Sequence, residues 1–394
     1  MFHRQILWIV ATFLLRISDQ RRLSACRRYV CYIEPKMLAP RTPYIFSPHH
    51  VDPDLCSHII VYAVGLDGNK INIASWHADK GLAKLSEHLK DLKLKKPKLK
   101  TLLTVGGEKP HSALFSKMAA TGTGRGEFIN SLIPFVREQG FDGVDLYWIF
   151  PTLHGGGPAD KVTYVDLIKD MATEFENEQL SSGRKKLMLS AWVPRTSYIV
   201  DWGYNVTEFA RYVDMINIGT FVYNGLVNSP IGHSSPLDSN DGKNIKQTLR
   251  HWVDRGMPRP KINVAIPAFG LRGYTKSSSD MKLGESIMTG EAVTYNSRGQ
   301  GILTYYQVCL LLKQGGSVHW DSIAQAPYHI KDNYFLSYEN EQSIKEKVLF
   351  LRENNYGGVI FRSLSEDDYL GLNCGTGTYP LLRAIKKQCL TRDY

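Results

Sequence analysis

Short apolar runs alternate with longer amphipathic segments along most of the chain. Within the short runs, apolar residues occupy successive positions rather than every second one, as in strands buried on both faces. Several runs end at Gly or Pro, which interrupt regular structure. This pattern predicts strands over 29–33, 58–63, 100–105, 187–191, 215–218, 261–266 and 358–361, with a further strand inside 140–151.

The segments between these runs carry apolar residues at helical spacing. In 127–139, for example, Phe128, Leu132 and Phe135 share one face, and Gly140 is placed to end the helix. The same reasoning predicts helices over 83–94, 127–139, 161–179, 244–255, 305–313, 343–354 and 379–389.

Regular alternation of strand and helix predicts an α/β fold, a (β/α)8 TIM barrel. We assign residues 26–270 and 339–394 to the barrel. Over 271–338 the rhythm breaks into sequence rich in Gly, Ser and Tyr, with short strand-like pieces and one helix. The sequence therefore predicts a small α+β insertion between strands seven and eight.

The stretch 140–151 carries the most informative side chains. It contains Asp142, Asp145, Tyr147 and Ile149 in a short buried strand, and we expect its acidic and aromatic side chains at or near the strand's C-terminal end. In an α/β barrel, that end of the strands is where chemistry takes place.

This stretch resembles the fourth-strand signature of the family 18 glycoside hydrolases, Asp-Gly-x-Asp-x-Asp-x-Glu. Asp142, Gly143 and Asp145 match, whereas Tyr147 replaces the third Asp and Ile149 replaces the Glu. The resemblance implies that the missing Glu is the general acid and that the missing Asp orients the substrate's N-acetyl group, the nucleophile. Isoleucine has no proton to donate, and general acid help is typically worth ~10²–10⁴-fold.

Other parts of the resemblance point the same way. After strand six, the family's Tyr and Asp are replaced by Phe221 and Val222. The resemblance therefore implies no catalytic residue, with degenerate positions at Asp142, Asp145, Tyr147, Ile149, Phe221 and Val222. Because these groups act as one unit, their joint loss predicts an inactive protein.

The family's three cleft tryptophans align with charged residues, namely Lys36, Glu108 and Arg362. An anionic ligand is therefore as consistent with the cleft as plain chitin. We predict ligand-binding residues at Tyr32, Lys36, Glu108, Tyr147, Tyr223, Asn224, Phe269 and Arg362.

Three functions follow from these substitutions. The first is a secreted, inactive chitinase-like protein that acts by binding, as a lectin or a signalling factor. The second is a protein-interaction scaffold without a glycan ligand, and the third is a divergent hydrolase with a relocated acid such as Glu108. Candidate partners are chitin or chitooligosaccharides, an anionic glycan and a cell-surface receptor.

The chain shows no zinc-ligand spacing, phosphate loop or nucleic-acid module, so we predict no metal, cofactor or nucleic-acid partner, and the oligomeric state stays open. The net charge is +10, and lysines gather between Lys90 and Lys100. That run is either a solvated helix–strand connection or a polyanion patch on the barrel face opposite the cleft.

The N-terminus and the cysteines indicate the compartment. Residues 1–25 contain the apolar run 6–15 and predict a signal peptide, or alternatively an uncleaved anchor, and hence an extracellular protein. Six cysteines are typical of an oxidising compartment. The resemblance implies the pairs Cys31–Cys56 and Cys309–Cys374, and the states of Cys26 and Cys389 stay open. Asn205 begins the sequon Asn-Val-Thr, which predicts N-glycosylation.

Overall fold

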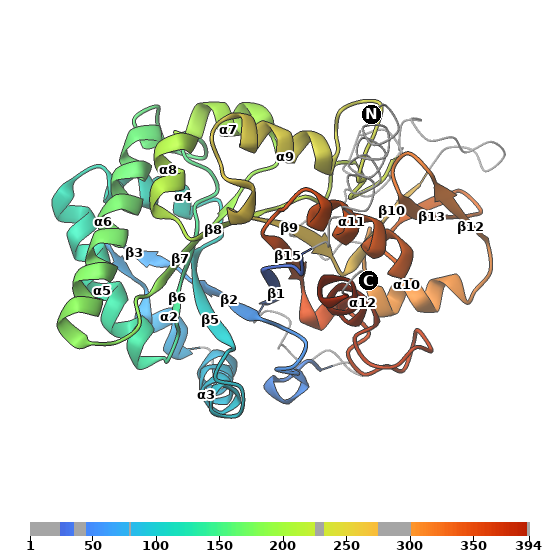
Figure 1. Cartoon of the computed structure of the whole chain (residues 1–394), viewed down its shortest axis with the longest axis horizontal. Coiled ribbons are helices and arrows are strands. Elements are labelled where there is room, and N and C mark those ends of the chain that lie inside the picture. Colours follow the sequence, from blue (N-terminus) through green and yellow to red (C-terminus); the bar gives the residue numbers. More distant parts are fainter. Residues whose placement is uncertain (1–23, 35–44, 79, 225–231, 275–300, 392–394) are drawn as a thin grey trace, which may run out of the picture.

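A closed barrel of eight parallel strands organises the molecule (Figure 1). The structure is a computed structural model that describes residues 24–34, 45–78, 80–224, 232–274 and 301–391. Around the barrel the strands follow the order β1-β15-β9-β8-β7-β6-β5-β2. They are β1 (Arg28–Ile33), β2 (His58–Val64), β5 (Lys100–Gly106), β6 (Gly143–Tyr147), β7 (Met188–Val193), β8 (Met215–Ile218), β9 (Ile262–Pro267) and β15 (Gly358–Arg362). The predicted TIM barrel is confirmed.

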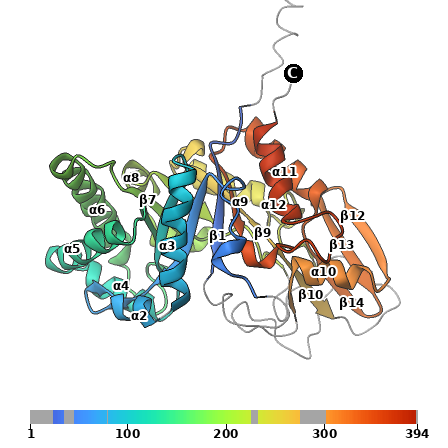
Figure 2. The same cartoon turned by 90° about the horizontal axis from the view of Figure 1, so that it is seen from below.

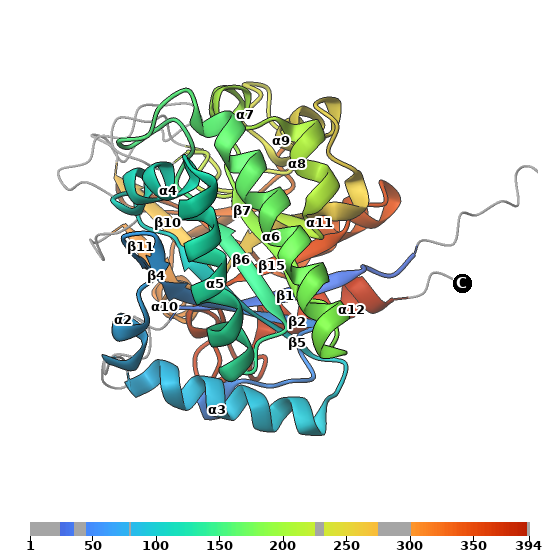
Figure 3. The same ribbon diagram turned by 90° about the vertical axis from the view of Figure 1, so that its left-hand side faces the viewer.

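Helices cover the outside of the barrel, and Figure 3 shows α5 and α6 side by side on one flank. In the described part of the chain, the helices of at least eight residues are α3 (Lys80–Lys95), α4 (His111–Ala119), α5 (Gly122–Glu138), α6 (Asp160–Ser182), α9 (Ile245–Asp254), α10 (Tyr305–Leu312), α11 (Glu341–Glu353) and α12 (Pro380–Leu390). Shorter helical pieces are α2 (Ile73–Ala78), α7 (Ser197–Gly203), α8 (Val206–Tyr212), η2 (Pro48–His50), η3 (Arg259–Lys261) and η4 (Leu364–Glu366).

Strand geometry explains why the apolar runs are continuous. In β2, Ile59 and Val61 belong to the outer layer between strands and helices, whereas Ile60 points into the barrel. Both faces are therefore buried, and each position favours an apolar side chain. The outer layer is large and contains bulky residues such as Trp76, packed edge-on against Phe135 at a centroid distance of 5.6 Å. Burying a side chain of this size contributes roughly 1.5–3 kcal/mol.

A five-stranded antiparallel sheet lies between the last two barrel strands in sequence (Figure 2). Its order is β11-β10-β14-β13-β12. The strands are β10 (Phe269–Tyr274), β11 (Ile302–Thr304), β12 (Ser317–Asp321), β13 (Ala326–Lys331) and β14 (Tyr334–Ser337). A separate two-stranded sheet pairs β3 (Leu66–Asp67) with β4 (Lys70–Ile71). The larger sheet begins at Phe269, before the boundary expected at residue 271, because β10 already pairs with β11 there. Part of the predicted insertion, 275–300, lies outside the described residues.

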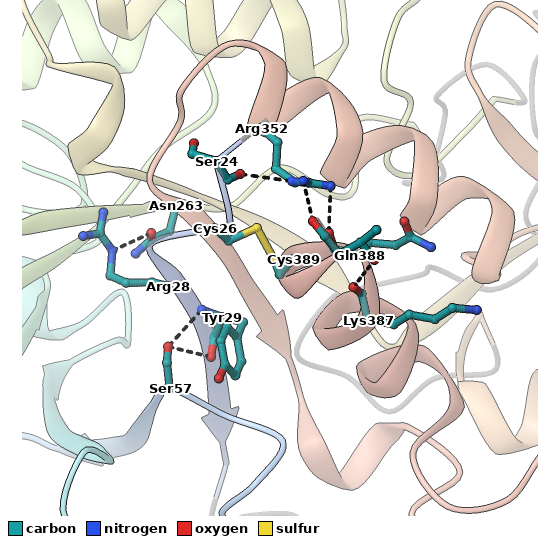
Figure 4. The surroundings of a disulfide bond; sticks show 11 residues. Ser24, Cys26, Arg28, Tyr29, Ser57, Asn263, Arg352, Lys387, Gln388 and Cys389 are labelled. Atoms are coloured by element: carbon teal, nitrogen blue, oxygen red, sulfur yellow. Dashed lines mark hydrogen bonds between the residues drawn. A yellow bond between two sulfur atoms is a disulfide. The ribbon is translucent and has the colours of Figure 1, made fainter. Parts of the chain in front are cut away.

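Disulfides join distant parts of this frame. Cys31–Cys56 and Cys309–Cys374 form with Cα–Cα distances of 5.8 and 5.1 Å, which confirms the two implied pairs. The remaining cysteines form a third bond (Figure 4). It joins Cys26, which precedes β1, to Cys389 of α12.

The N-terminal segment was predicted to be a signal peptide or an uncleaved anchor. It falls almost wholly on residues 1–23, outside the described residues. Within the described ranges, no helix combines the length and apolar character needed to cross a bilayer.

Candidate functional site

Aromatic rings line the inside of the barrel at the C-terminal ends of its strands. Tyr32 of β1 and Tyr147 of β6 both contact Trp192 of β7, each at a centroid distance of 5.4 Å. Phe221, just after β8, lies 6.3 Å from Trp192, and Phe269 of β10 meets Phe221 edge-on at 5.6 Å. We call Tyr32, Tyr147, Trp192 and Phe221 the aromatic floor. These four rings come from three strands and from the loop after β8, which barrel closure brings together.

Arg362 covers this floor. It is the last residue of β15, and its guanidinium carbon lies 5.0 Å from the Tyr32 ring centroid, 5.3 Å from that of Trp192 and 5.8 Å from that of Phe221. A cation over several ring faces is attracted by their negative π-surfaces. The residue is only 6% exposed, so its charge is largely removed from water.

Glu34 supplies the opposite charge. Its carboxylate pairs with the Arg362 guanidinium, and its side chain is 20% exposed against 8% for that of Arg362. The two residues lie 328 positions apart in the sequence. Glu34 follows β1 and Arg362 ends β15, and these two strands are neighbours in the barrel. A half-buried carboxylate therefore holds a buried guanidinium at the barrel mouth.

Glu366 is a second carboxyl group near this pair. It accepts hydrogen bonds from the backbone N–H of Ser363 at 2.9 Å and from the Ser363 hydroxyl at 3.2 Å. Burial and the charge of Glu34 raise the pKa of Glu366 to about 7, although the Arg362 charge acts in the opposite direction. Near neutral pH this group thus exchanges between neutral and charged forms.

Asp145 lies deeper, inside the barrel, and its oxygens are engaged. It accepts hydrogen bonds from the hydroxyl of Ser190 at 2.5 Å, the hydroxyl of Thr104 at 3.2 Å and the amide of Asn217 at 3.0 Å. The residue is fully buried, and burial raises the pKa of its carboxyl to about 6. These contacts give Asp145 a structural role at the centre of the barrel.

Asp142 does not lie where the sequence predicted. It precedes β6 and therefore sits at the N-terminal end of the barrel, opposite the aromatic floor. There it pairs with Lys93 at 2.7 Å and Lys100 at 3.5 Å, and it accepts the Thr101 backbone N–H at 2.9 Å. The expectation that the acidic side chains of this stretch lie at the C-terminal end is wrong for Asp142, because β6 begins only at the next residue.

Most of the remaining candidate residues of the barrel mouth pack inside it, but Tyr223 does not. Ile149, Val222 and Phe269 pack with the aromatic floor. Tyr223 instead points outward, where its hydroxyl meets that of Thr248 on α9 at 2.6 Å. Val222 has a φ of 59°, a left-handed conformation rare for a β-branched residue, at the point where the chain turns outward.

Three candidates have other surroundings. Asn224 is buried and donates from its amide to the His233 carbonyl at 3.4 Å. Glu108 follows β5 and is exposed. Lys36 lies outside the described residues. The sequence analysis did not pair Glu34 with Arg362. The pair could have been predicted from the adjacency of the first and last strands in a closed barrel.

The predicted glycosylation site lies on the surface. Asn205 is exposed and caps α8, its side-chain oxygen accepting the Glu208 backbone N–H at 3.4 Å. It borders a surface hollow of about 380 Å³ that is also lined by Lys161, Asp201 and Arg255. A substituent on the amide nitrogen would leave the capping oxygen available.

The side chains at the mouth differ from those of the family signature. Ile149 contributes only hydrocarbon, Asp145 accepts hydrogen bonds from three side chains, and Glu34 is paired with Arg362. Across the described part of the chain, no group of three or more His, Cys, Asp or Glu is arranged to hold a metal ion. What the mouth does offer is ring faces and a fixed positive charge.

A closed barrel of eight parallel strands surrounded by helices defines a TIM-barrel protein. The sequence matches the family described as Glycosyl hydrolases family 18 over residues 28–367, and the chain belongs to this family. It is 33% identical to chitotriosidase-1 of Mus musculus, over 92% of this chain and 78% of that protein. It is 32% identical to chitinase-3-like protein 2 of Homo sapiens, over 97% and 96% of the two chains.

A solved structure extends the comparison to three dimensions. Human YKL-39, described as a pseudo-chitinase with retained chitooligosaccharide binding properties, superposes with a TM-score of 0.85 at 32% identity. The match covers 92% of this chain and all of that one (100%). Chitinase-like proteins are thus similar to this chain over nearly its whole length.

Proposed function

We propose that this protein is a secreted, catalytically inactive chitinase-like protein that acts by binding a glycan at the barrel mouth. One observation carries the proposal: Ile149 stands where the family signature has its acid, and it packs with the floor as hydrocarbon. Tyr147, Phe221 and Val222 replace the partners of that acid, so no single neighbour restores the unit.

Similarity to binding proteins supports the same proposal. The solved relative described as a pseudo-chitinase binds chitooligosaccharides, according to its description. In this chain, Tyr32, Tyr147, Phe269 and Arg362 are the described candidates that meet at the mouth. We propose chitooligosaccharides or an anionic glycan as ligands, with a cell-surface receptor as a further partner.

The first experiment measures turnover and binding together. Purified full-length protein is incubated with a fluorogenic chitotriose and, separately, with chitin beads and a glycan array. We expect glycan retention without turnover. Steady turnover that disappears in Glu108→Gln would instead establish the relocated acid, and absence of any glycan binding would favour a protein-interaction scaffold.

Ile149→Glu is the matching gain-of-function control. The single substitution restores a carboxyl at the signature position but leaves Tyr147, Phe221 and Val222 unchanged. We expect no measurable turnover from this variant, because groups that act together contribute little alone.

Secretion and glycosylation are parts of the proposal with their own measurements. Three disulfides are typical of an oxidising compartment, and Asn205 is exposed within a sequon. Expression of the full chain in cultured animal cells should deliver it to the medium. Mass spectrometry should find a glycan at Asn205 that is missing in Asn205→Gln.

A further inference from the structure

We infer that the barrel mouth selects an oligosaccharide that carries a carboxylate over a neutral one, because Arg362 receives that acid group in place of Glu34. The inference rests on the proposed binding function and names the ligand class of that site. Three observations support it. Arg362 already covers the aromatic floor, Glu34 is the partner that a ligand can replace, and further ionisable groups surround this pair.

The floor is already occupied. The guanidinium lies 5.0 to 5.8 Å from the centroids of Tyr32, Trp192 and Phe221. A pyranose stacked on any of these rings needs the same space, since stacked groups approach to comparable distances. A neutral sugar would therefore have to displace a buried cation, and it offers no charge to compensate for the broken ion pair.

A carboxylate on the ligand avoids this cost. Arg362 is always charged and presents a planar fork that fits a carboxylate with two parallel hydrogen bonds. Glu34 is the more exposed partner, with 20% of its side chain accessible, and it follows the end of β1. It can turn to solvent while the ligand's acid group takes its place, so the guanidinium never lacks a counter-charge.

The other ionisable groups around the pair make the exchange sensitive to pH. They are Tyr32 from β1, Tyr62 from β2, Asp145 and Tyr147 from β6, and Glu366 from η4. Burial raises the pKa of all three tyrosines, to about 12 for Tyr147, so their hydroxyls stay neutral near pH 7.

The two remaining carboxyls respond to an incoming anion. Burial raises the pKa of Asp145 to about 6 and that of Glu366 to about 7. Because Glu34 turns to solvent but stays beside the mouth, the ligand's carboxylate adds to the negative charge near Glu366 and raises its pKa further, so binding takes up protons. Affinity is then highest where Glu366 is already neutral, below about pH 7, and falls as the pH rises through that value.

The experiment compares two sugars that differ only in charge. One is a hexasaccharide of alternating glucuronate and N-acetylglucosamine, and the other is the same molecule after carboxyl reduction to glucose. Calorimetry with the full-length protein at pH 5.5 and pH 8 should show tighter binding of the acidic sugar, most clearly at pH 5.5. Neutral chitohexaose is measured alongside.

Three variants locate the effect. Arg362→Met removes the charge and keeps the aliphatic stem, and it should weaken acidic-sugar binding by ~10- to 100-fold. Glu34→Gln removes the competing charge and should strengthen it several-fold. Arg259→Met is the matched control, because Arg259 also lies over a ring, Tyr356 at 5.4 Å, but precedes β9 at the opposite end of the barrel. It should leave binding unchanged.

The outcomes separate the two proposals. Binding of chitohexaose with no preference for the acidic sugar overturns this inference and leaves the proposed binding function standing. No binding of any of the three sugars overturns both. Acidic-sugar binding that Arg362→Met and Glu34→Gln leave unchanged, or that Arg259→Met reduces equally, shows general attraction to the basic surface and overturns the inference. If Arg362→Met fails to fold, the Glu34→Gln variant still tests whether a carboxylate binds at Arg362.

Discussion

At the scale of single residues, two ionisable groups inside the barrel, Arg362 and Asp145, have different surroundings. Arg362 keeps its charge because Glu34 and three ring faces compensate for lost water. Asp145 has three hydrogen-bond donors and forms no ion pair among the described residues, so burial favours its neutral form. A charge inside a barrel therefore depends on its immediate partners rather than on depth alone.

Asp145 should make stability depend on pH. Its folded pKa of about 6 exceeds the ordinary value for Asp, so the folded state holds more protons than the unfolded state between these values. The free energy of unfolding should fall by roughly 3 kcal/mol from this group as the pH rises from about 4 to about 6. Asp145→Asn should remove that part of the slope in urea titrations.

Ser190→Ala provides a test of the cause. This change removes a donor to Asp145 while keeping the carboxyl group. The charged form loses support, so the pH window of falling stability should extend upward. Identical slopes in the wild type and in Asp145→Asn would rule out Asp145 as the origin.

At the scale of elements, a buried ion pair lies where the chain passes from the five-stranded sheet back to the barrel. Lys347 of α11 pairs with Glu339, which lies just after β14, and both side chains are 1–2% exposed. Glu339 also accepts the Ser343 hydroxyl at 2.6 Å, and Asn340 caps the helix through the Ser343 backbone N–H at 2.9 Å. The start of α11 is thus anchored at the junction of the two sheets.

Lys347→Met should be strongly destabilising. It leaves the Glu339 carboxylate buried without a counter-charge, which typically costs about 3–5 kcal/mol. The double variant Glu339→Gln with Lys347→Met removes both charges and should recover most of the loss. Chemical denaturation of the three proteins measures the coupling, and additive losses would contradict the role of the pair.

At the scale of the whole molecule, residues near the two ends of the described chain are joined beside the barrel. Cys26, next to β1, is bonded to Cys389 of α12 across 363 residues of sequence. Beside this bond, Arg352 donates to the carbonyls of Ser24 and Gln388 (Figure 4). It also donates to the carbonyl of Thr391. Because β1 pairs with both β15 and β2, fastening it completes the ring of strands.

Opening that bond should weaken the whole barrel. The double variant Cys26→Ser with Cys389→Ser should lower the free energy of unfolding by roughly 2–5 kcal/mol, chiefly because the unfolded chain regains freedom. Thermal and urea unfolding under non-reducing conditions measure the loss. Arg352 contacts should keep the ends in place, so glycan binding at the mouth should persist, and its loss would contradict this view.

The lysine run lies far from the mouth and is largely partnered. Lys93 and Lys100 pair with Asp142 at the N-terminal end of the barrel, Lys96 pairs with Asp54, and Lys90 donates to the Glu138 carbonyl. These contacts favour the solvated connection over a polyanion patch, and they place this part of the net charge at the opposite end of the barrel from the buried cation Arg362.

The sequence by itself determined the order of strands and helices, the barrel, and the absence of an acid at residue 149, because apolar periodicity and side-chain identity are local properties. Only the tertiary structure decided that Glu34 meets Arg362, that Asp145 accepts hydrogen bonds from Ser190, Thr104 and Asn217, and that Tyr223 faces outward. These contacts join strands far apart in the chain, and ring closure rather than local sequence sets the distances between them.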